Sequence, residues 1–388
     1  MSEKVLMKGN EALAESAIRA GCRFFFGYPI TPQTELAAYM AKRMPKEGGV
    51  FLQAESEIAA VNMLYGASAA GARCMTSSSS PGISLKSEGI SYMAGADLPA
   101  VIINVQRGGP GLGGIQPSQA DYFQATRGVG HGDSRIIVIA PSSVQEMADY
   151  VFGAFDLADK YRTPVMILAD GMLGQMMEPV VLQERKDDLP EKPWAANGHK
   201  NARKNHIITS LYLDPQELED LNVARFERYA QIEATEQRAE EYLTEDADIV
   251  LVAFGASSRI ARSAVNAARA KGIKAGMIRP ITLWPFPTKV IENRVESAKA
   301  FLTVEMNMGQ MVQDVRLTVC GRRPVSFFGR TGGIIPTPAE VLGEIEKIAA
   351  VCGLAGMAAG AGIASATPAP ASGCGCGCTT ADSKGGCC

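Results

Sequence analysis

The chain has 388 residues, of which 46% are hydrophobic and 20% are charged. This composition is typical of a globular protein with a sizeable core, and roughly 100–200 residues per domain suggests two or three domains. With 38 Lys and Arg against 41 Asp and Glu, the net charge of −3 gives no global basic field, which argues against nucleic acid or an anionic membrane as partner.

The first half of the chain alternates short apolar segments with helical ones. Strands are predicted at 23–26, 72–76, 100–105, 135–140 and 164–169, and helices at 11–20, 54–70, 84–95 and 142–160. Such alternation predicts a parallel α/β sheet with right-handed crossovers. We assign this first domain to 1–184.

A charged connector over 185–246 interrupts the alternation. It contains a predicted long helix with Asp214 as N-cap, Pro215 at its first position and Glu217 completing a capping box. A second α/β domain is predicted over 247–352. Its strands are expected at 249–254, 273–278 and 300–305, with a helix at 258–271.

The nine cysteines are unevenly distributed: Cys22, Cys74, Cys320 and Cys352 stand alone, and five others lie in the last 15 residues. Isolated thiols in a long chain favour a reduced, cytoplasmic protein, and the N-terminus shows no secretory signal. The stretch 353–388 is rich in Gly, Ala and Cys, so we expect a disordered tail. Its small residues also argue against a membrane span.

A glycine-rich loop follows the predicted strand at 100–105. Gly109, Gly111 and Gly114 have G-x-G-x-x-G spacing, but Pro117 stands where the helix of a dinucleotide site would run. The interpretation that we prefer is a loop whose backbone approaches some ligand closely.

Two candidate site residues come early in the chain. Thr31 lies in the loop Gly-Tyr-Pro-Ile-Thr-Pro (27–32), where flanking prolines fix the backbone, although a structural turn would give the same pattern. Glu57 falls on a helix face with Val61, Leu64 and Ser68, so its carboxylate could be buried at a helix N-terminus. A solvated first-turn glutamate is the simpler alternative, and it suits Glu55 better.

Further polar candidates follow two other strands. Arg107 ends a strand and enters the glycine loop, where its guanidinium could bind a carboxylate or phosphate, or form a structural salt bridge. The serines over 77–80 and His131 could line a pocket, but their spacing is not diagnostic.

Several of these segments together resemble the alpha subunit of 2-oxoacid:ferredoxin oxidoreductases. They are GYPITP, AESEIAA, MTSSSSPG, NVQRGGPG, SQADYFQATRGVGHGD and APSSVQEM, and the resemblance covers about 9–180 and 247–350. The serine run and its flanks look most like the branched-chain (2-oxoisovalerate, 3-methyl-2-oxobutanoate) members. The 2-oxoglutarate branch is the alternative.

The resemblance implies an α/β fold, with a pyrimidine-type thiamin-diphosphate-binding parallel-sheet domain followed by a transketolase C-terminal-like domain. It implies that Glu57 hydrogen-bonds the aminopyrimidine ring, and that Thr31 and Arg107 hold the 2-oxoacid. The residues that it places at the cofactor are Tyr28, Pro29, Ile30, Glu57, Ser79 and Ser80. The implied reaction is a coenzyme A-dependent oxidative decarboxylation to acyl-CoA that reduces ferredoxin.

The family also implies partner subunits. Asp170-Gly171 followed by Asn197 is an incomplete version of the Gly-Asp-Gly and Asn pattern that holds Mg²⁺ and the diphosphate, because Ala169 replaces the first glycine. We therefore expect no metal site here, and a beta subunit that carries that motif. The C-x₂-C-x₂-C run of ferredoxins is also missing, so the iron–sulfur clusters are expected in a ferredoxin-like subunit. The presence of a gamma subunit as a further partner is left open.

A different class of function remains open at this stage. The chain could be a non-catalytic scaffold, or it could bind a soft metal through Cys374, Cys376 and Cys378.

Overall fold

Seven strands form the larger of the two main sheets in the computed structural model, which describes residues 4–354. The strands are, in spatial order, β12 (Thr282–Trp284), β6 (Ile137–Ile139), β7 (Pro164–Asp170), β5 (Ala100–Gln106), β4 (Cys74–Ser78), β2 (Phe24–Gly27) and β3 (Val50–Gln53). All neighbours are parallel except β12, which runs antiparallel to β6. The loops that follow β2, β4 and β5 therefore meet at one edge of the sheet, where parallel α/β folds bind ligands.

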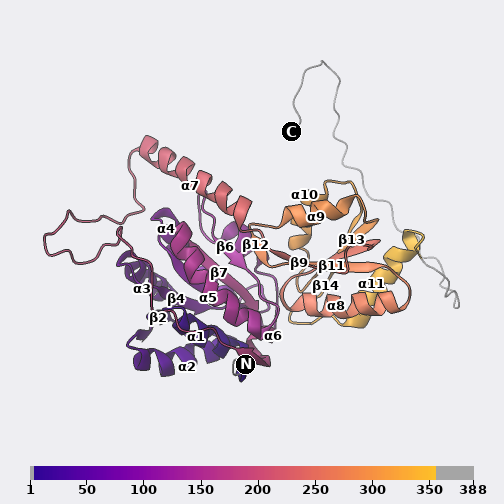
Figure 1. The fold of residues 1–388 in the computed structure, drawn as a ribbon, viewed down its shortest axis with the longest axis horizontal. Coiled ribbons are helices and arrows are strands. Elements are labelled where there is room, and N and C mark those ends of the chain that lie inside the picture. Colours follow the sequence, from indigo (N-terminus) through magenta and orange to yellow (C-terminus); the bar gives the residue numbers. More distant parts are fainter. Residues whose placement is uncertain (1–3, 355–388) are drawn as a thin grey trace, which may run out of the picture. The chain divides into compact units, whose positions relative to one another are not determined.

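Helices cover both faces of this sheet (Figure 1). One face carries α1 (Gly9–Arg19), α2 (Thr34–Arg43), α5 (Val144–Tyr161) and the short α6 (Gly171–Gln175), and the other carries α3 (Glu57–Ala69) and α4 (Ser80–Gly95). Val101 and Ile103 of β5 face the first group, whereas Ile102 packs with Val61 and Ile90 of the second. Because both faces are buried, the strand is a continuous apolar run.

Smaller elements complete this half of the chain. They are an antiparallel ribbon of β1 (Lys4–Lys8) and β8 (Met177–Val181), a 3-10 helix (Met44–Glu47) and a π-helical turn (Gln124–Gly128). The connector contains α7 (Pro215–Thr235), which Asp214 caps by accepting a hydrogen bond from Gln216 N at 3.0 Å.

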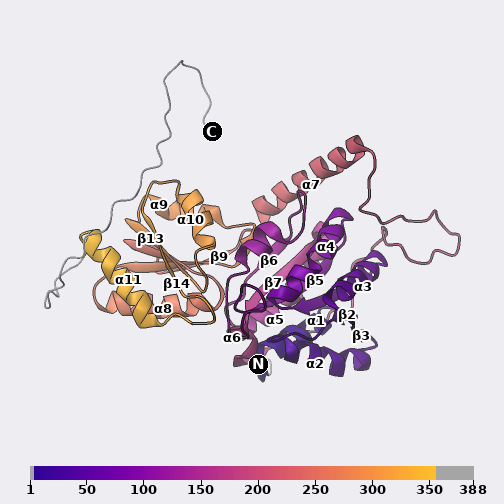
Figure 2. The same cartoon turned by 180° about the vertical axis from the view of Figure 1, so that it is seen from behind.

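A second sheet of five strands belongs to the C-terminal half. Its order is β14 (Val325–Gly329), β13 (Ala300–Glu305), β10 (Ile249–Val252), β11 (Ala275–Pro280) and β9 (Ala239–Tyr242), with only β9 antiparallel to its neighbour. As Figure 2 shows, α8 (Gly255–Ala270) and α11 (Pro338–Val351) lie on one side of it, and α9 (Thr288–Val295) and α10 (Met311–Val319) on the other.

Gln119 joins the segment after β5 to the second sheet. Its Nε2 donates to Phe254 O at 2.8 Å, and its Oε1 accepts from Met306 N at 3.1 Å. Asn307 Nδ2 donates to the Gln119 carbonyl at 2.8 Å. Since the Gln119 side chain is fully buried, these bonds fix the loop that follows the glycine-rich segment.

The α/β class and the alternation of strands and helices predicted from the sequence are confirmed. Several elements, among them α2, β3 and β14, were not predicted, and three further details differ. The short β12, from within 247–352, joins the first sheet, and β9, from the connector, joins the second. The capping box expected of Glu217 does not form, because Asp214 alone caps α7. The predicted tail lies outside the described residues from 355 onward. In the described part, every helix is too short or too polar to cross a membrane.

Candidate functional site

Glu57 is the first residue of α3 and its side chain is buried. Ser56 caps the helix by accepting a hydrogen bond from Ala59 N at 3.1 Å, so α3 begins where the apolar face begins. Glu57 is only 6% exposed and lies on the buried face with Val61, whereas Glu55 is exposed. The solvated alternative therefore holds for Glu55 and fails for Glu57. The positive end of the α3 dipole favours a carboxylate here.

The Glu57 carboxylate lies against the first turn of α4. A methyl group built on Gly82 would overlap Ser78 Oγ and would come within 2.7 Å of Glu57 Oε1. Gly82 does not have a positive φ, so space alone requires glycine at this position. Helix α4 can thus approach α3 closely enough to enclose the carboxylate.

The serine run at the end of β4 provides two kinds of side chain. The hydroxyls of Ser78 and Ser79 are buried and have no hydrogen-bond partner in the described structure. Ser80 Oγ instead donates to Asp121 Oδ2 at 2.7 Å and accepts from Arg107 N at 3.0 Å. Buried hydroxyls without partners are costly, so Ser78 and Ser79 are the hydroxyls available to a ligand. Of the two serines predicted at the cofactor, Ser80 is engaged within the protein.

Arg107 and Thr31 lie side by side at the same edge of the sheet. Arg107 Nη1 donates to the Thr31 carbonyl at 3.0 Å, and Nη2 donates to the Leu112 carbonyl at 3.0 Å. The Arg107 Nε is buried and has no partner in the described structure, while Thr31 is exposed. The structural salt bridge that the sequence left open for Arg107 does not form within residues 4–354, since the guanidinium donates to backbone carbonyls. A positive group with a free donor therefore lies beside an exposed hydroxyl-bearing residue.

The loop after β2 carries the remaining predicted residues. Tyr28 is 38% exposed, Pro29 is exposed and Ile30 is half-buried. Gln33, which the sequence analysis missed, fixes this loop: its Nε2 donates to Tyr28 O at 3.3 Å and its Oε1 accepts from Ser77 Oγ at 2.6 Å.

A polar pair of buried Asn104 and half-buried Asp121 supports the site and was also missed. Asn104 Nδ2 donates to Asp121 Oδ2 at 2.9 Å, and Asn104 Oδ1 accepts from Ser80 N at 3.2 Å. Burial raises the pKa of Asp121, although its bonds to Ser80 and Asn104 oppose that shift. The signal in the sequence was the amide of Asn104 inside the apolar run AVIINV, because a buried amide needs a hydrogen-bond partner.

The glycine loop is not a dinucleotide site. No helix opens after Gly114, and Arg107 instead pairs with Pro117 in an isolated bridge. Gly114 N donates to Gly108 O at 2.9 Å, so the loop folds back on itself.

Asp170 and Asn197 do not form a joint metal site. Asp170 caps α6 by accepting from Met172 N and Leu173 N at 2.9 and 3.0 Å, and burial raises its pKa to about 6. Asn197 Oδ1 accepts from Arg203 in the connector at 2.8 Å. Within 4–354, no cluster of three or more His, Cys, Asp or Glu could hold a metal ion.

His131 lies apart from these residues. Its backbone bonds the Ser91 hydroxyl, and its ring packs edge-on against Tyr92 at 6.0 Å between centroids.

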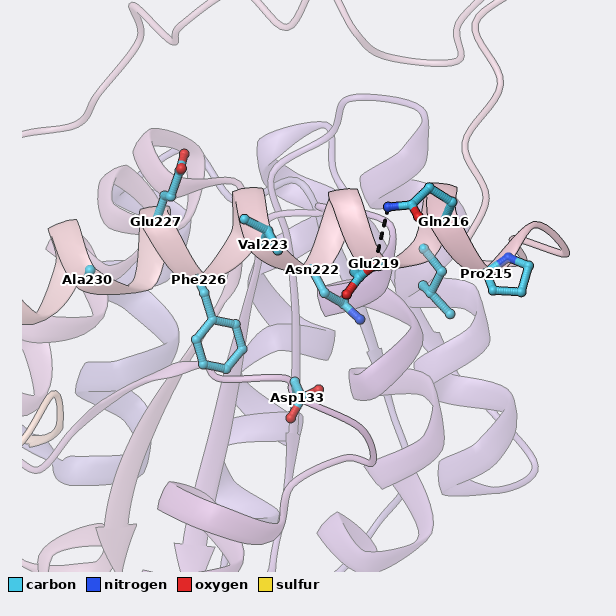
Figure 3. A pocket seen from close by; sticks show the side chains of 10 residues that line it. Asp133, Pro215, Gln216, Glu219, Asn222, Val223, Phe226, Glu227 and Ala230 are labelled. Atoms are coloured by element: carbon cyan, nitrogen blue, oxygen red, sulfur yellow. Dashed lines mark hydrogen bonds between the residues drawn. The ribbon is translucent and has the colours of Figure 1, made fainter. Parts of the chain in front are cut away.

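A surface groove of about 960 Å³ lies elsewhere, along α7 (Figure 3). Val223 and Phe226 line it opposite Asp133, and both apolar side chains are about half exposed. The groove contains none of the residues predicted at the site. This groove is a hollow beside a helix. We place the site at the edge of the seven-stranded sheet instead, because buried polar groups converge there.

The chain matches two family models. Residues 15–248 match the thiamine diphosphate-binding domain of pyruvate flavodoxin/ferredoxin oxidoreductases, and 247–341 match core domain II of pyruvate:ferredoxin oxidoreductase. The chain therefore belongs to the 2-oxoacid:ferredoxin oxidoreductase family, as a subunit of a multi-subunit enzyme.

Individual relatives refine this comparison. The ketoisovalerate oxidoreductase subunit VorB of Methanothermobacter marburgensis is 52% identical over 89% of this chain and 97% of its own length. The 2-oxoglutarate synthase subunit KorA of Methanothermobacter thermautotrophicus is 39% identical over 90% of this chain and 100% of its own length.

Among solved structures, the chain resembles 2-oxoglutarate:ferredoxin oxidoreductase from Magnetococcus marinus with 2-oxoglutarate, coenzyme A and succinyl-CoA bound. The TM-score is 0.79 at 29% identity, covering 89% of this chain and 65% of that one. A split-gene transketolase, with a TM-score of 0.55 and 15% identity, shares the fold alone.

Proposed function

We propose that this chain provides the pyrimidine-binding half of a thiamin diphosphate site in an enzyme that oxidatively decarboxylates 2-oxoisovalerate to acyl-CoA and reduces ferredoxin. The observation that carries the proposal is the buried Glu57 carboxylate, enclosed by Gly82 at the edge of the sheet near unpartnered serine hydroxyls. These groups suit a ring that both donates and accepts hydrogen bonds. They also argue against a non-catalytic scaffold, which would not need unpartnered polar groups in its interior.

Each side chain has a proposed task. When bound, thiamin diphosphate supplies the electron sink for loss of CO₂ from a 2-oxoacid. The Glu57 carboxylate hydrogen-bonds a ring nitrogen of the aminopyrimidine and exchanges a proton with it. Tyr28, Pro29 and Ile30 form the wall beside the ring, and Ser79 offers its hydroxyl. Arg107 binds the carboxylate of the 2-oxoacid, and the Thr31 hydroxyl binds the keto oxygen.

The rest of the active enzyme is proposed to come from partner chains. A beta subunit would supply the Mg²⁺ and diphosphate motif, because the described residues offer no metal cluster and Asp170 is occupied as a helix cap. A ferredoxin-like subunit would carry the iron–sulfur clusters, and the presence of a gamma subunit is left open. Exposed apolar side chains next to the site, Ile58 and Leu112 at 50% and 83% exposure, suit cover by another subunit. The cytoplasmic location expected from the sequence stays a proposal.

Substrate choice is tested by assaying the assembled enzyme with 2-oxoisovalerate, 2-oxoglutarate and pyruvate in parallel. We expect the highest kcat/KM with 2-oxoisovalerate, because VorB shares more of this sequence than KorA does. Ferredoxin reduction and acyl-CoA formation are the two readouts. A preference for 2-oxoglutarate would contradict the branched-chain assignment and would leave the family unchanged.

Substituting Gly82 with alanine is expected to displace the Glu57 carboxylate, because the new methyl group would meet it and Ser78. Thiamin diphosphate should then bind the assembled enzyme at least about tenfold more weakly, the equivalent of about 1.4 kcal/mol. Equilibrium titration of the cofactor measures this effect.

Gly66→Ala is the matched control on α3, because a methyl group at Gly66 meets nothing within 4 Å. Alanine is favoured over glycine inside a helix by about 1 kcal/mol, so this variant should keep its cofactor affinity, and its thermal midpoint should stay the same or rise. Equal affinities of the two variants would contradict the proposed position of Glu57 at the cofactor.

A further inference from the structure

Lys86 is a buried lysine for which the proposed mechanism has no task. Its side chain is fully buried on α4, which is unusual for lysine unless the ammonium has a partner. The hydrogen bond that the described structure gives its Nζ is a long one, 3.5 Å to the backbone carbonyl of Glu57. An ammonium has three donors, so Lys86 has donors to spare at this place.

The position of Lys86 on α4 links it to Glu57 as well. Lys86 follows Gly82 by four residues, so both lie on the same face of α4. That face is the one against which Glu57 Oε1 is enclosed. The ammonium therefore lies on the side of α4 that faces Glu57, and the bond that the described structure gives it goes to the Glu57 backbone carbonyl and not to the carboxylate.

Several other titratable groups lie near α4. The titratable groups on the elements packed against this helix are Glu57 and Tyr65 on α3, Arg107 after β5, Asp170 at the end of β7, Asp121 and His131 in the segment that contacts Ser80 and Ser91, and Arg225 of α7, which bonds Gly95. Of these, Glu57 is the one whose charge acts on Lys86. Burial lowers the pKa of Lys86 to about 8, and the Glu57 charge opposes that shift. At neutral pH the ammonium is therefore mostly charged, and it loses its charge as the pH rises through about 8.

We propose that Lys86 is a positioning residue whose buried ammonium holds the first turn of α3 through the Glu57 backbone carbonyl, so that the Glu57 side chain is oriented toward the cofactor ring. This inference rests on the proposed role of Glu57. A hydrogen bond donated by an ammonium to a carbonyl is stronger than one between neutral groups, and burial away from water strengthens it further. Without the ammonium, the Glu57 carbonyl loses this donor, and the turn that carries the Glu57 side chain is held less firmly.

The test is the affinity of the assembled enzyme for thiamin diphosphate, titrated from neutral to alkaline pH. In the natural enzyme we expect affinity to fall as the pH rises through about 8. Lys86→Met, which keeps the length and removes the charge, should weaken binding at neutral pH at least about tenfold and abolish the inflection. Lys86→Arg should bind well at neutral pH and keep its affinity to higher pH, because the guanidinium stays charged.

Lys192→Met is the matched control. Lys192 is also a mostly buried lysine, with Nζ at 2.7 Å from Asp159 Oδ1, and it has no part in the site. Its variant should keep the natural affinity and the natural pH dependence. Steady-state kinetics add a second control, because Lys86→Met should leave the KM for the 2-oxoacid unchanged.

The outcomes separate this inference from the proposed function. The proposed role of Lys86 is wrong if Lys86→Met binds the cofactor like the natural enzyme at every pH. It is also wrong if Lys192→Met weakens cofactor binding as much as Lys86→Met does. If the Lys86→Met variant does not assemble with the partner subunits, Lys86→Arg provides the test. A Lys86→Arg variant that still loses cofactor affinity near pH 8 would equally show that the proposed role of Lys86 is wrong. If Glu57→Ala retains normal affinity and turnover, the proposed function itself fails, whatever Lys86 does.

Discussion

Glu57→Ala in the assembled enzyme is expected to abolish measurable decarboxylation. Proton exchange by a positioned side chain typically contributes about 10²- to 10⁴-fold to a rate, and no other carboxylate replaces Glu57 at the N-terminus of α3 in the described structure. The loss should appear in kcat, because the step that fails is chemical. The measurement is CO₂ release from 2-oxoisovalerate at saturating substrate and cofactor.

Glu55→Ala is the natural control for this variant. Glu55 lies two residues earlier, is exposed, and has the same charge. It should retain full turnover. Assembly with the partner subunits must be the same in both variants, and substantial turnover by Glu57→Ala in an intact complex would disprove the assignment of Glu57.

Arg107→Ala is expected to act mainly on the KM for the 2-oxoacid. A hydrogen bond to a charged group is worth about 1.5–3 kcal/mol, which corresponds to roughly a 10- to 100-fold increase in KM. Arg107 Nε is buried and free in the described structure, so the residue retains a donor for substrate while its other nitrogens bond Thr31 and Leu112. A steady-state titration with 2-oxoisovalerate measures the effect.

Two further variants show whether the effect is specific. Arg127→Ala removes a half-exposed arginine paired with Asp314, and it should leave KM unchanged. Arg107→Lys keeps the charge but not the forked geometry, so its KM should lie between those of the natural enzyme and Arg107→Ala. A fall in kcat with unchanged KM would instead indicate that Arg107 serves to hold the glycine loop.

The fold was largely predictable because its signals are local. The strands β5 and β7 are largely apolar on both faces, and helices such as α5 and α7 begin at a residue that caps them. The small strand β12 was not predictable, since its three residues show no periodicity and pair with β6 more than 140 residues earlier in the chain. A short strand of this kind is defined by its partner.

The candidate site was predictable in its residue types and less so in its contacts. Helical spacing placed Glu57 on the apolar face, but only the close approach of α4 at Gly82 distinguishes an enclosed carboxylate from a solvated one. A run of four serines cannot reveal that Ser80 is engaged while Ser79 is free. Lys86 was missed for the same reason, because nothing in its neighbours along the chain indicates that its ammonium is buried beside Glu57. The partners of all these residues lie far away in the sequence.

The most direct measurement is an experimental structure of the assembled enzyme with thiamin diphosphate bound. We predict that a ring nitrogen of the aminopyrimidine lies within hydrogen-bonding distance, about 2.6–3.2 Å, of the Glu57 carboxylate, with the diphosphate and Mg²⁺ held by the partner subunit. A cofactor bound entirely by the other subunits, with Glu57 away from its ring, would contradict the account.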